Sequence, residues 1–298
     1  MVKNKKKWSV TNIILTALIV ILLGVVGYSG FKLFGMYQKY HHNTVSQNKV
    51  SEVFYGQQTT VEQEAQEGSA VTPTTATENP FTQEAYSLSS LVAQNPDTVG
   101  WINIPDTTVD FAVMQAADND YYLHRDFFRE YNYPGIPFLD FTNTPGAKRQ
   151  NYIIYGHRMK DKSMFWIIGE YLEQDWYEQH KNFTLLLRVG KEDIMYDCEV
   201  FAVYRLTTSV DAWQTVFATD DDYARYIQAC YDRSNIKTDV VVTPETDEQI
   251  LTLSTCDSLL SATEGRLLVH AKMTERSRTP VQMPSQPAQG SSQESSQQ

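Results

Sequence analysis

The stretch "ILTLSTCDSLL", Ile250 to Leu260, combines a run of apolar and hydroxyl residues with a cysteine at its end, Cys256. A short run of this composition favours a buried β-strand. The chain has three cysteines, and this one closes the strand pattern. Taken alone, Cys256 has three interpretations: a small buried residue, half of a disulfide, or a nucleophile placed at the end of a strand.

Similar strand patterns recur on both sides of this stretch, within residues 81–273. The segments are "VGWINI", "VDFAVM", "IPFLDF", "NYIIYGH", "FTLLLRV", "IMYDCEVFAVYRL", "DVVVT", "QILTLSTC" and "GRLLVHAKM". Three helical patterns interrupt them, within residues 82–96, from about Ser163 to His180, and at residues 220–234. Many short strands with few helices predict a mainly β domain, either a closed barrel or a sandwich.

The N-terminus joins a basic tip to a long uncharged run. Lys3, Lys5, Lys6 and Lys7 precede residues 8–31, which contain no charged side chain over 24 positions. As a helix this run would rise about 36 Å at ~1.5 Å per residue, enough to cross a bilayer core of roughly 30 Å. The lysines favour a cytoplasmic N-terminus. A cleaved signal peptide is the alternative, although its apolar region is usually only about 7–15 residues.

These patterns divide the chain into five parts. We expect a cytoplasmic tip at residues 1–7, a transmembrane anchor at 8–31, an extracytoplasmic stalk at 32–80, a globular domain at 81–273 and a disordered tail at 274–298. Residues 59–80 and the tail contain too few large apolar side chains to form a core. If the stalk is only a spacer, removal of residues 1–80 should leave the chemistry of the domain intact.

Charge and cysteine content narrow the functions that the chain can have. The net charge is −11, and outside the four lysines 21 basic residues face 36 acidic ones, which argues against a nucleic-acid partner. We expect no metal and no cofactor, because the His41–His42 pair has no supporting Cys or acidic cluster. Cys198 and Cys230 are most simply buried residues, with a disulfide between them as the alternative.

His157 is the candidate partner of Cys256, because it also follows a strand pattern, "NYIIYG", at residues 151–156. A cysteine and a histidine far apart in the sequence, each at the end of a strand, are what nucleophilic catalysis requires. Arg266 lies ten residues after Cys256, at the start of the next strand pattern. If these two strands pair as a hairpin, Arg266 returns beside Cys256 and lowers the pKa of its thiol.

Three other histidines have simpler interpretations. His124 lies in "LHRDFF", which imitates a kinase catalytic loop, but no Gly-rich phosphate loop precedes it. His180 ends a polar helix, where it favours the helix C-terminus. His270 lies inside an apolar strand pattern, where packing is the simplest interpretation, although it could also face the site.

Together these segments resemble the class B sortases. The resemblance is carried by "TLSTC", an arginine ten residues after the cysteine, and "NYIIYGHRMKDKSMF" about 100 residues upstream. The segments "NPDTVGWINIP", "DNDYYLHRDF" and "IPFLDF" also resemble the opening strands of that family. The resemblance covers residues 90–273 in the order of the family.

The resemblance implies an eight-stranded β-barrel that acts as a cysteine transpeptidase. Such an enzyme cleaves a C-terminal sorting motif of a secreted protein and joins the new carboxyl end to an amine. It implies Cys256 as nucleophile, His157 as general acid and base, Arg266 as holder of the substrate or oxyanion, and Tyr155 and Ser254 as substrate contacts. The expected motif is of the Asn-Pro-x-Thr type, and the amine belongs to peptidoglycan or to a pilin lysine. The helix at residues 220–234 would lie in the loop between the sixth and seventh strands, which helps to read the motif.

Two other functions fit the same residues. A cell-wall cysteine peptidase or amidase would pair Cys256 with His270 and transfer to water, and an anchored β-domain adhesin would leave Cys256 inert. Two features depart from the family pattern. Asp257 places a carboxylate beside Cys256, which tends to raise the thiol pKa, and His270 stands where the family commonly has an apolar residue.

Overall fold

The computed structural model describes residues 10–65, 86–207, 213–243, 249–256 and 265–281. Cys256 is described as part of a strand, while its side chain lies outside the described atoms. Asp257, the segment 66–85 and the tail beyond Val281 also lie outside the described residues.

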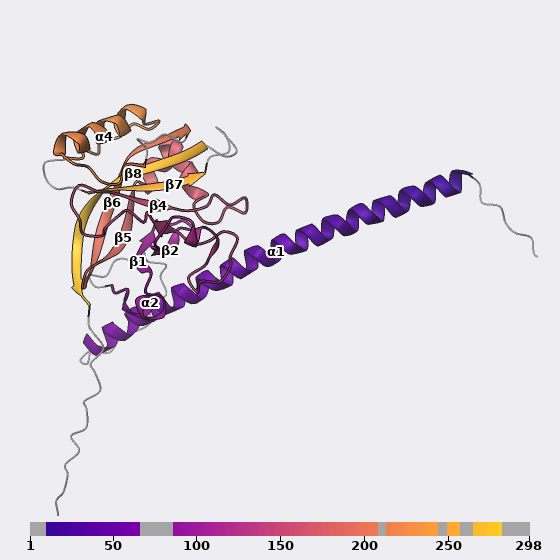
Figure 1. Ribbon diagram of the computed structural model, residues 1–298, viewed down its shortest axis with the longest axis horizontal. Coiled ribbons are helices and arrows are strands. Elements are labelled where there is room, and N and C mark those ends of the chain that lie inside the picture. Colours follow the sequence, from indigo (N-terminus) through magenta and orange to yellow (C-terminus); the bar gives the residue numbers. More distant parts are fainter. Residues whose placement is uncertain (1–9, 66–85, 208–212, 244–248, 257–264, 282–298) are drawn as a thin grey trace, which may run out of the picture.

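Eight strands close into a barrel with the neighbour order β1-β2-β3-β4-β7-β8-β6-β5, which confirms the mainly β, closed-barrel prediction (Figure 1). The strands are β1 (Thr98–Asn103), β2 (Asp110–Met114), β3 (Phe138–Leu139), β4 (Asn151–Tyr155), β5 (Asn182–Val189), β6 (Glu192–Thr207), β7 (Gln249–Cys256) and β8 (Gly265–Pro280). The β2–β3 and β4–β7 pairs are parallel and the other pairs are antiparallel. Alternate apolar side chains of these strands fill the barrel interior, as the period of two in each strand predicts.

Eight of the nine strand-like segments form these strands, and "DVVVT" does not. Val240 and Val242 are buried against the helix α4 (Asp220–Arg233), so the apolar pattern is real. The backbone of this segment bonds to a side chain instead of a strand, because Tyr231 donates to Val240 O and accepts from Val242 N. The prediction of a strand here was therefore wrong.

The predicted helices at residues 82–96 and 220–234 are confirmed as α2 (Ser89–Gln94) and α4, the latter capped by Thr219. The helix expected from Ser163 to His180 is instead two pieces, the 3-10 helix η3 (Ile167–Leu172) and α3 (Gln174–His180). Tyr171 and Tyr177 are both buried in the barrel core. A helix makes one turn in about 3.6 residues, so two residues six positions apart in a continuous helix face different directions. The break at Glu173 lets both tyrosines point inward.

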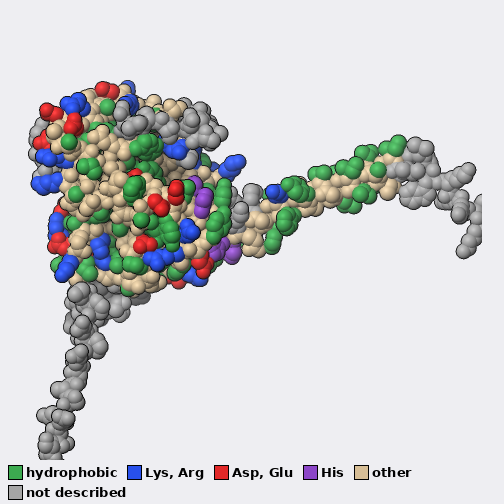
Figure 2. All heavy atoms as spheres, in the orientation of Figure 1, with side chains coloured by type: hydrophobic (Ala, Val, Ile, Leu, Met, Phe, Trp, Pro, Cys, Tyr) green, Lys and Arg blue, Asp and Glu red, His purple; other side chains and the backbone are tan. Residues whose placement is uncertain are grey.

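The helix α1 (Val10–Ala65) runs without interruption from the apolar N-terminal segment to the barrel. Residues Ile14–Gly35 are long and apolar enough to cross a membrane, a test that a signal sequence near the N-terminus also passes. Figure 1 shows this half of α1 projecting away from the barrel, and Figure 2 shows its surface lined with hydrophobic side chains. A single helix thus connects a candidate membrane span to the folded domain.

The second half of α1 differs from the expected stalk, because it belongs to the hydrophobic core. Val50 and Phe54 are buried, and the Phe54 ring stacks on Trp101 of β1 with centroids 4.1 Å apart. Tyr55 donates to Asp110 of β2 at 2.7 Å. Removal of residues 1–80 would expose this surface of the barrel, so the part of the expected stalk that the structure describes, residues 32–65, is not simply a spacer.

The last strand also passes the expected domain end at Met273 and continues to Pro280. Its final residues pair with the equally long β6, in a register that places Thr274 opposite Asp197 and Pro280 opposite Glu192. Ion pairs between Arg276 and Asp197 and between Arg278 and Glu192 cross this ladder. The extension was missed because its side chains are mostly exposed and lack an apolar alternation.

Replacing Phe54 with alanine should lower the free energy of unfolding by about 3–5 kcal/mol, since it removes a fully buried aromatic side chain and leaves a cavity against Trp101. Denaturant unfolding would measure the change. Val45→Ala is the matched control, because Val45 is an exposed apolar residue of the same helix, and its change should be below about 0.5 kcal/mol. Equal effects of the two substitutions would show that α1 does not contribute to the core.

Candidate active site

Three neighbouring strands bring the predicted catalytic residues to one end of the barrel. Strand β4 runs parallel to β7 with Tyr155 opposite Ser254, and Gly156 N extends the pairing by donating to Ser254 O at 3.1 Å. His157 therefore follows β4 at the same edge where β7 ends at Cys256. On the other side of β7, Cys256 is the direct antiparallel partner of Arg266. Side chains that are directly opposite in such a pair lie on one face of the sheet, so the predicted hairpin geometry is confirmed at the level of the backbone.

A cavity of about 370 Å³ opens at this edge. It is lined by four predicted residues, His157, Arg266, Tyr155 and Ser254. The other lining residues were not predicted from the sequence, namely Asn119, Asp120, Leu123, Phe138, Gly156, Trp213 and Thr255. Most of these come from irregular segments between strands, which carry no periodic signal that could have revealed them.

The His157 imidazole is fixed by the segment before β3. Its Nε2 lies 2.9 Å from Leu123 O, and because a carbonyl only accepts, Nε2 carries the proton and Nδ1 is the other nitrogen of the neutral ring. The ring stacks on His124, with centroids 5.2 Å apart and an interplanar angle of 16°. Burial lowers the pKa of His157, the bond to Leu123 raises it, and His124 lowers it further. His124 is thus part of the environment of the candidate base. The kinase-like motif around His124 did not predict this position.

Tyr155 and Ser254 form adjoining walls of the cavity. The Tyr155 hydroxyl donates to Asp140 at 2.8 Å, and its ring contacts Phe138 and Trp213, with centroid distances of 5.3 and 5.9 Å. Burial raises the pKa of Tyr155, so it stays a neutral donor. Ser254 is buried.

Thr255 also lines the cavity, but its hydroxyl is buried. The residue is 2% exposed, and its Oγ1 makes no hydrogen bond to the residues that the structure describes. An unpaired buried hydroxyl of this kind costs about 1–3 kcal/mol.

Arg266 supplies the positive charge of the site. Its guanidinium donates to Gly265 O at 2.9 Å, lines the cavity, and lowers the pKa of Tyr155 against the larger effect of burial. Arginine keeps its charge at any pH at which a cysteine enzyme works. The site therefore has a fixed positive charge on Arg266, the residue that pairs with Cys256.

His270 is not part of this site. It lies on β8 opposite Thr252, four residues from Arg266, and it is completely buried. Its two ring nitrogens lie 2.8 Å from Thr252 Oγ1 and 2.9 Å from Tyr204 OH. Burial lowers the pKa of His270 to about 3, so it is a neutral core residue. The pairing of Cys256 with His270 that a peptidase alternative requires is wrong on this geometry.

Acidification should destabilise the protein through His270. The unfolded chain takes up a proton near pH 6.5, whereas the folded chain does so only near 3. The contribution of His270 is therefore complete above pH 6.5 and falls by about 1.4 kcal/mol per pH unit below it. Denaturant unfolding at several pH values between about 7 and 4 should show a shallower loss in His270→Gln than in the native protein. Equal slopes in the two proteins would contradict the assignment.

The other two cysteines are structural. Cys198 of β6 and Cys230 of α4 are free and buried, so the disulfide alternative is wrong. Burial raises the pKa of the Cys198 thiol well above its ordinary value and that of Cys230 to about 12. Neither thiol is suited to act as a nucleophile.

Among the described residues, one group has the spacing of metal ligands: His42, Asp126 and Glu130, whose ligand atoms lie within 4.8 Å of one another. These residues lie where α1 meets the segment that follows His124, outside the cavity lining. The cavity itself presents an imidazole and a guanidinium, a combination that suits acyl transfer.

Comparison with known proteins agrees with this arrangement. The family model "Sortase domain" matches residues 102–274. Sortase B of Listeria monocytogenes is 32% identical over 87% of this chain and 96% of its own length. Sortase B of Staphylococcus aureus is 37% identical over 62% of this chain and 74% of its own length.

Solved structures show the same fold. A crystal structure of S. aureus sortase B superposes with a TM-score of 0.58 at 36% identity, over 64% of this chain and 87% of that one. An S. aureus sortase B–substrate complex gives a TM-score of 0.65 at 32% identity, over 80% of this chain and all of that one. An adhesin without enzymatic activity is thereby excluded. The chain belongs to the sortase family and, within it, to the class B cysteine transpeptidases.

Proposed function

We propose that this sortase is anchored in the membrane by α1, cleaves a C-terminal sorting motif of secreted proteins through a thioester on Cys256, and transfers them to an amine of the cell wall. The observation that carries the proposal is that His157, after β4, and Arg266, on β8, line one cavity, while the strand between them, β7, ends at Cys256, the backbone partner of Arg266. Each residue supplies a different part of an acyl transfer.

In the first half of the reaction the Cys256 thiolate attacks the carbonyl carbon of the scissile peptide bond. The carbon–nitrogen bond then breaks, and the protonated His157 gives its proton to the leaving amine. The product is a thioester on Cys256. The Arg266 guanidinium supplies positive charge where the carbonyl oxygen becomes negative, without changing its own protonation.

In the second half an incoming amine attacks the thioester. His157, now neutral, accepts a proton from the nitrogen, and the Cys256 thiolate leaves. The protein and the acceptor are then joined by an amide bond, and the enzyme returns to its starting state. Burial lowers the pKa of His157, so at neutral pH only a small fraction of molecules holds the thiolate and the imidazolium together.

The cavity suits an extended peptide. Tyr155 and Ser254 form its walls, and the Arg266 guanidinium lies at the same cavity. We propose a motif of the Asn-Pro-x-Thr type, and α4 lies in the loop between β6 and β7 that would help to read it. Sortase B has been solved as a substrate complex, from S. aureus, and in complex with triglycine, which supports a peptide donor and an amine acceptor for this chain. The acceptor is either peptidoglycan or a pilin lysine.

The topology follows from α1. Four lysines precede the apolar segment, which supports a cytoplasmic N-terminus and a barrel outside the cell. Since α1 is one continuous helix, the barrel is held next to the membrane rather than on a long tether.

A transfer assay tests the proposal. The full chain is mixed with a peptide that contains the sorting motif and with triglycine or a lysine peptide, and the products are identified by mass spectrometry. We expect the joined peptide and a thioester intermediate on Cys256. Hydrolysed peptide alone, at saturating amine, would instead identify a peptidase. A scan of motifs against the two amines would then define donor and acceptor.

A further inference from the structure

One irregular segment, residues 121–136, lies between the catalytic histidine and the membrane-proximal part of α1. On the side of the cavity, its Leu123 carbonyl accepts a hydrogen bond from His157 at 2.9 Å. Its His124 ring stacks on the His157 ring. These are two contacts that orient the imidazole, and both come from the same segment.

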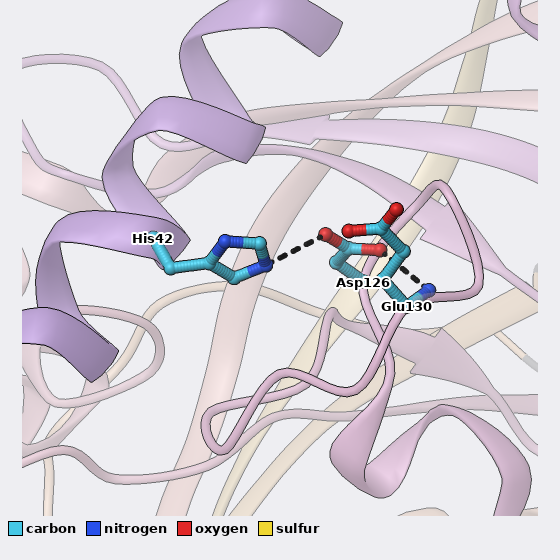
Figure 3. A group of neighbouring side chains, drawn as sticks. All are labelled: His42, Asp126 and Glu130. Carbon is cyan, nitrogen blue, oxygen red and sulfur yellow. Dashed lines mark hydrogen bonds and ion pairs between the residues drawn. The ribbon is translucent and has the colours of Figure 1, made fainter.

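The opposite side of the 121–136 segment is bonded to α1. Ser46 Oγ donates to Asp126 at 2.8 Å, and Asn132 donates to Asn43 at 2.8 Å. All four residues are at least nine-tenths buried. Figure 3 shows Asp126 between the His42 ring of α1, at 3.5 Å, and the backbone N–H of Glu130. Buried polar bonds of this kind are worth more than surface bonds, because water cannot replace them.

The two sides of the segment are connected by a short chain of bonds. The backbone N–H of Asn132 donates to His124 O at 3.0 Å, and His124 Nδ1 lies 2.8 Å from Tyr133 O. The turn closes tightly at Gly135, which has φ +60°, and a Cβ there would lie 2.5 Å from Leu123 O. A shift at Asn132 or Asp126 is therefore carried to Leu123 and His124.

Contacts with other elements hold the segment in place. On the side of β1, Asn95 Nδ2 donates to Phe127 O at 2.7 Å and the Tyr122 hydroxyl donates to Asp97 at 2.7 Å. The regular structure of the segment is the 3-10 helix η2 (Tyr121–His124) and an isolated bridge between Arg125 and Tyr131. Segments outside the sheet ladder owe their order to the elements packed on them. Here α1 is such an element.

We propose that Ser46 and Asn43 of α1 are positioning residues for the catalytic step: by holding the 121–136 segment through Asp126 and Asn132, they set the place of the Leu123 carbonyl and the His124 ring, and so the orientation of His157. The inference rests on the proposed role of His157 as acid and base. It makes the membrane-proximal helix part of the catalytic unit. The other contacts of this helix with the barrel contribute to the stability of the fold.

Another hydrogen bond between α1 and the barrel supplies a matched control. The hydroxyl of Tyr55, like that of Ser46, donates from α1 to a carboxylate. The acceptor of Tyr55 is the half-buried Asp110. Asp110 lies on β2 and also accepts from Trp101 and Asn103 of β1. This network bonds α1 to the sheet, whereas Ser46 bonds it to the 121–136 segment.

The experiment compares Ser46→Ala with Tyr55→Phe in the full-length chain, in detergent or nanodiscs. Each substitution removes one hydroxyl donor from α1. We expect Ser46→Ala to lower kcat about tenfold with KM within about twofold, because a displaced base slows the proton transfers more than it weakens binding. Tyr55→Phe should lower Tm and leave kcat within about twofold.

The titration of His157, followed by NMR of labelled histidine, provides a readout that a loss of stability would not move. The ring shares its surroundings with His124, Asp120 and Arg266. Burial lowers its pKa and the bond to Leu123 raises it, so a loosened segment should shift the titration midpoint in Ser46→Ala, and again in Asn43→Ala, but not in Tyr55→Phe. The inference is overturned if both α1 variants keep the native kcat and midpoint. Full activity of His157→Ala would contradict the proposed function instead, while the midpoints of the α1 variants would still decide the positioning role.

Discussion

Cys256→Ala should abolish thioester formation and reduce peptide transfer by more than about 10³-fold, because it removes the thiol that forms the proposed covalent intermediate. The substitution removes the nucleophile and leaves the β7–β8 ladder, in which Cys256 pairs with Arg266, able to form. Mass spectrometry of the intact protein after mixing with substrate would show the acyl adduct in the native chain and none in the variant.

The two buried cysteines provide the control for this experiment. Cys198→Ala and Cys230→Ala remove free thiols in β6 and α4, so they should lower stability and retain kcat. A small alkylating reagent should likewise modify Cys256 in the folded protein before either of them, since burial raises the pKa of both. Alkylation of Cys198 or Cys230 while Cys256 stays unmodified would contradict the assignment of Cys256 as the nucleophile.

His157→Ala should lower kcat for transfer by about 10²–10⁴-fold, the usual contribution of a general acid and base. The pH dependence gives a second test. Burial lowers the pKa of His157, so its imidazolium form declines at a lower pH than for an ordinary histidine, while the thiolate increases toward higher pH. The rate should therefore pass through a maximum, and this profile should be lost in His157→Ala.

The variant His270→Gln tests which of the two histidines acts as the base. His270 lies in the core between Thr252 and Tyr204 and does not line the cavity, so this variant should lose stability and keep most of its kcat. Full activity in His157→Ala together with inactivity in a folded His270→Gln protein would overturn the assignment of the base. The buried position also explains why this chain can have histidine where the resemblance predicts an apolar residue, because both ring nitrogens are bonded.

The N-terminal helix is where the structure changes the sequence-based picture most. Its apolar segment was recognised from length and charge, which are properties of the sequence. Its packing through Phe54 and Val50 was not, because a few apolar residues in a polar helix are equally compatible with a solvated stalk. Removal of residues 1–80 is therefore expected to destabilise the barrel and to free the segment beside His157, contrary to the simple spacer interpretation.

The candidate site was recoverable from the sequence to the extent that it follows strand ends. Cys256, His157, Arg266, Tyr155 and Ser254 all lie on or beside β4, β7 and β8, whose apolar patterns are strong. The remaining walls, such as Asn119, Leu123 and Trp213, come from irregular segments. Those residues reach the cavity through long-range folding, which leaves no local pattern to read.

The alternation that makes the strands, the thiol and imidazole at two strand ends, and the uncharged N-terminal run can all be read from the sequence, because each depends on residues close together in the chain. The stretch at residues 250–256 is the clearest case: its composition predicts β7, and its last residue is the proposed nucleophile. Which histidine lies beside that strand end depends on the packed barrel. His157 and His270 have similar sequence contexts, but β4 ends at the cavity whereas β8 carries His270 into the core. Strand register and burial set that difference, and both depend on how distant segments pack, which no local spacing records.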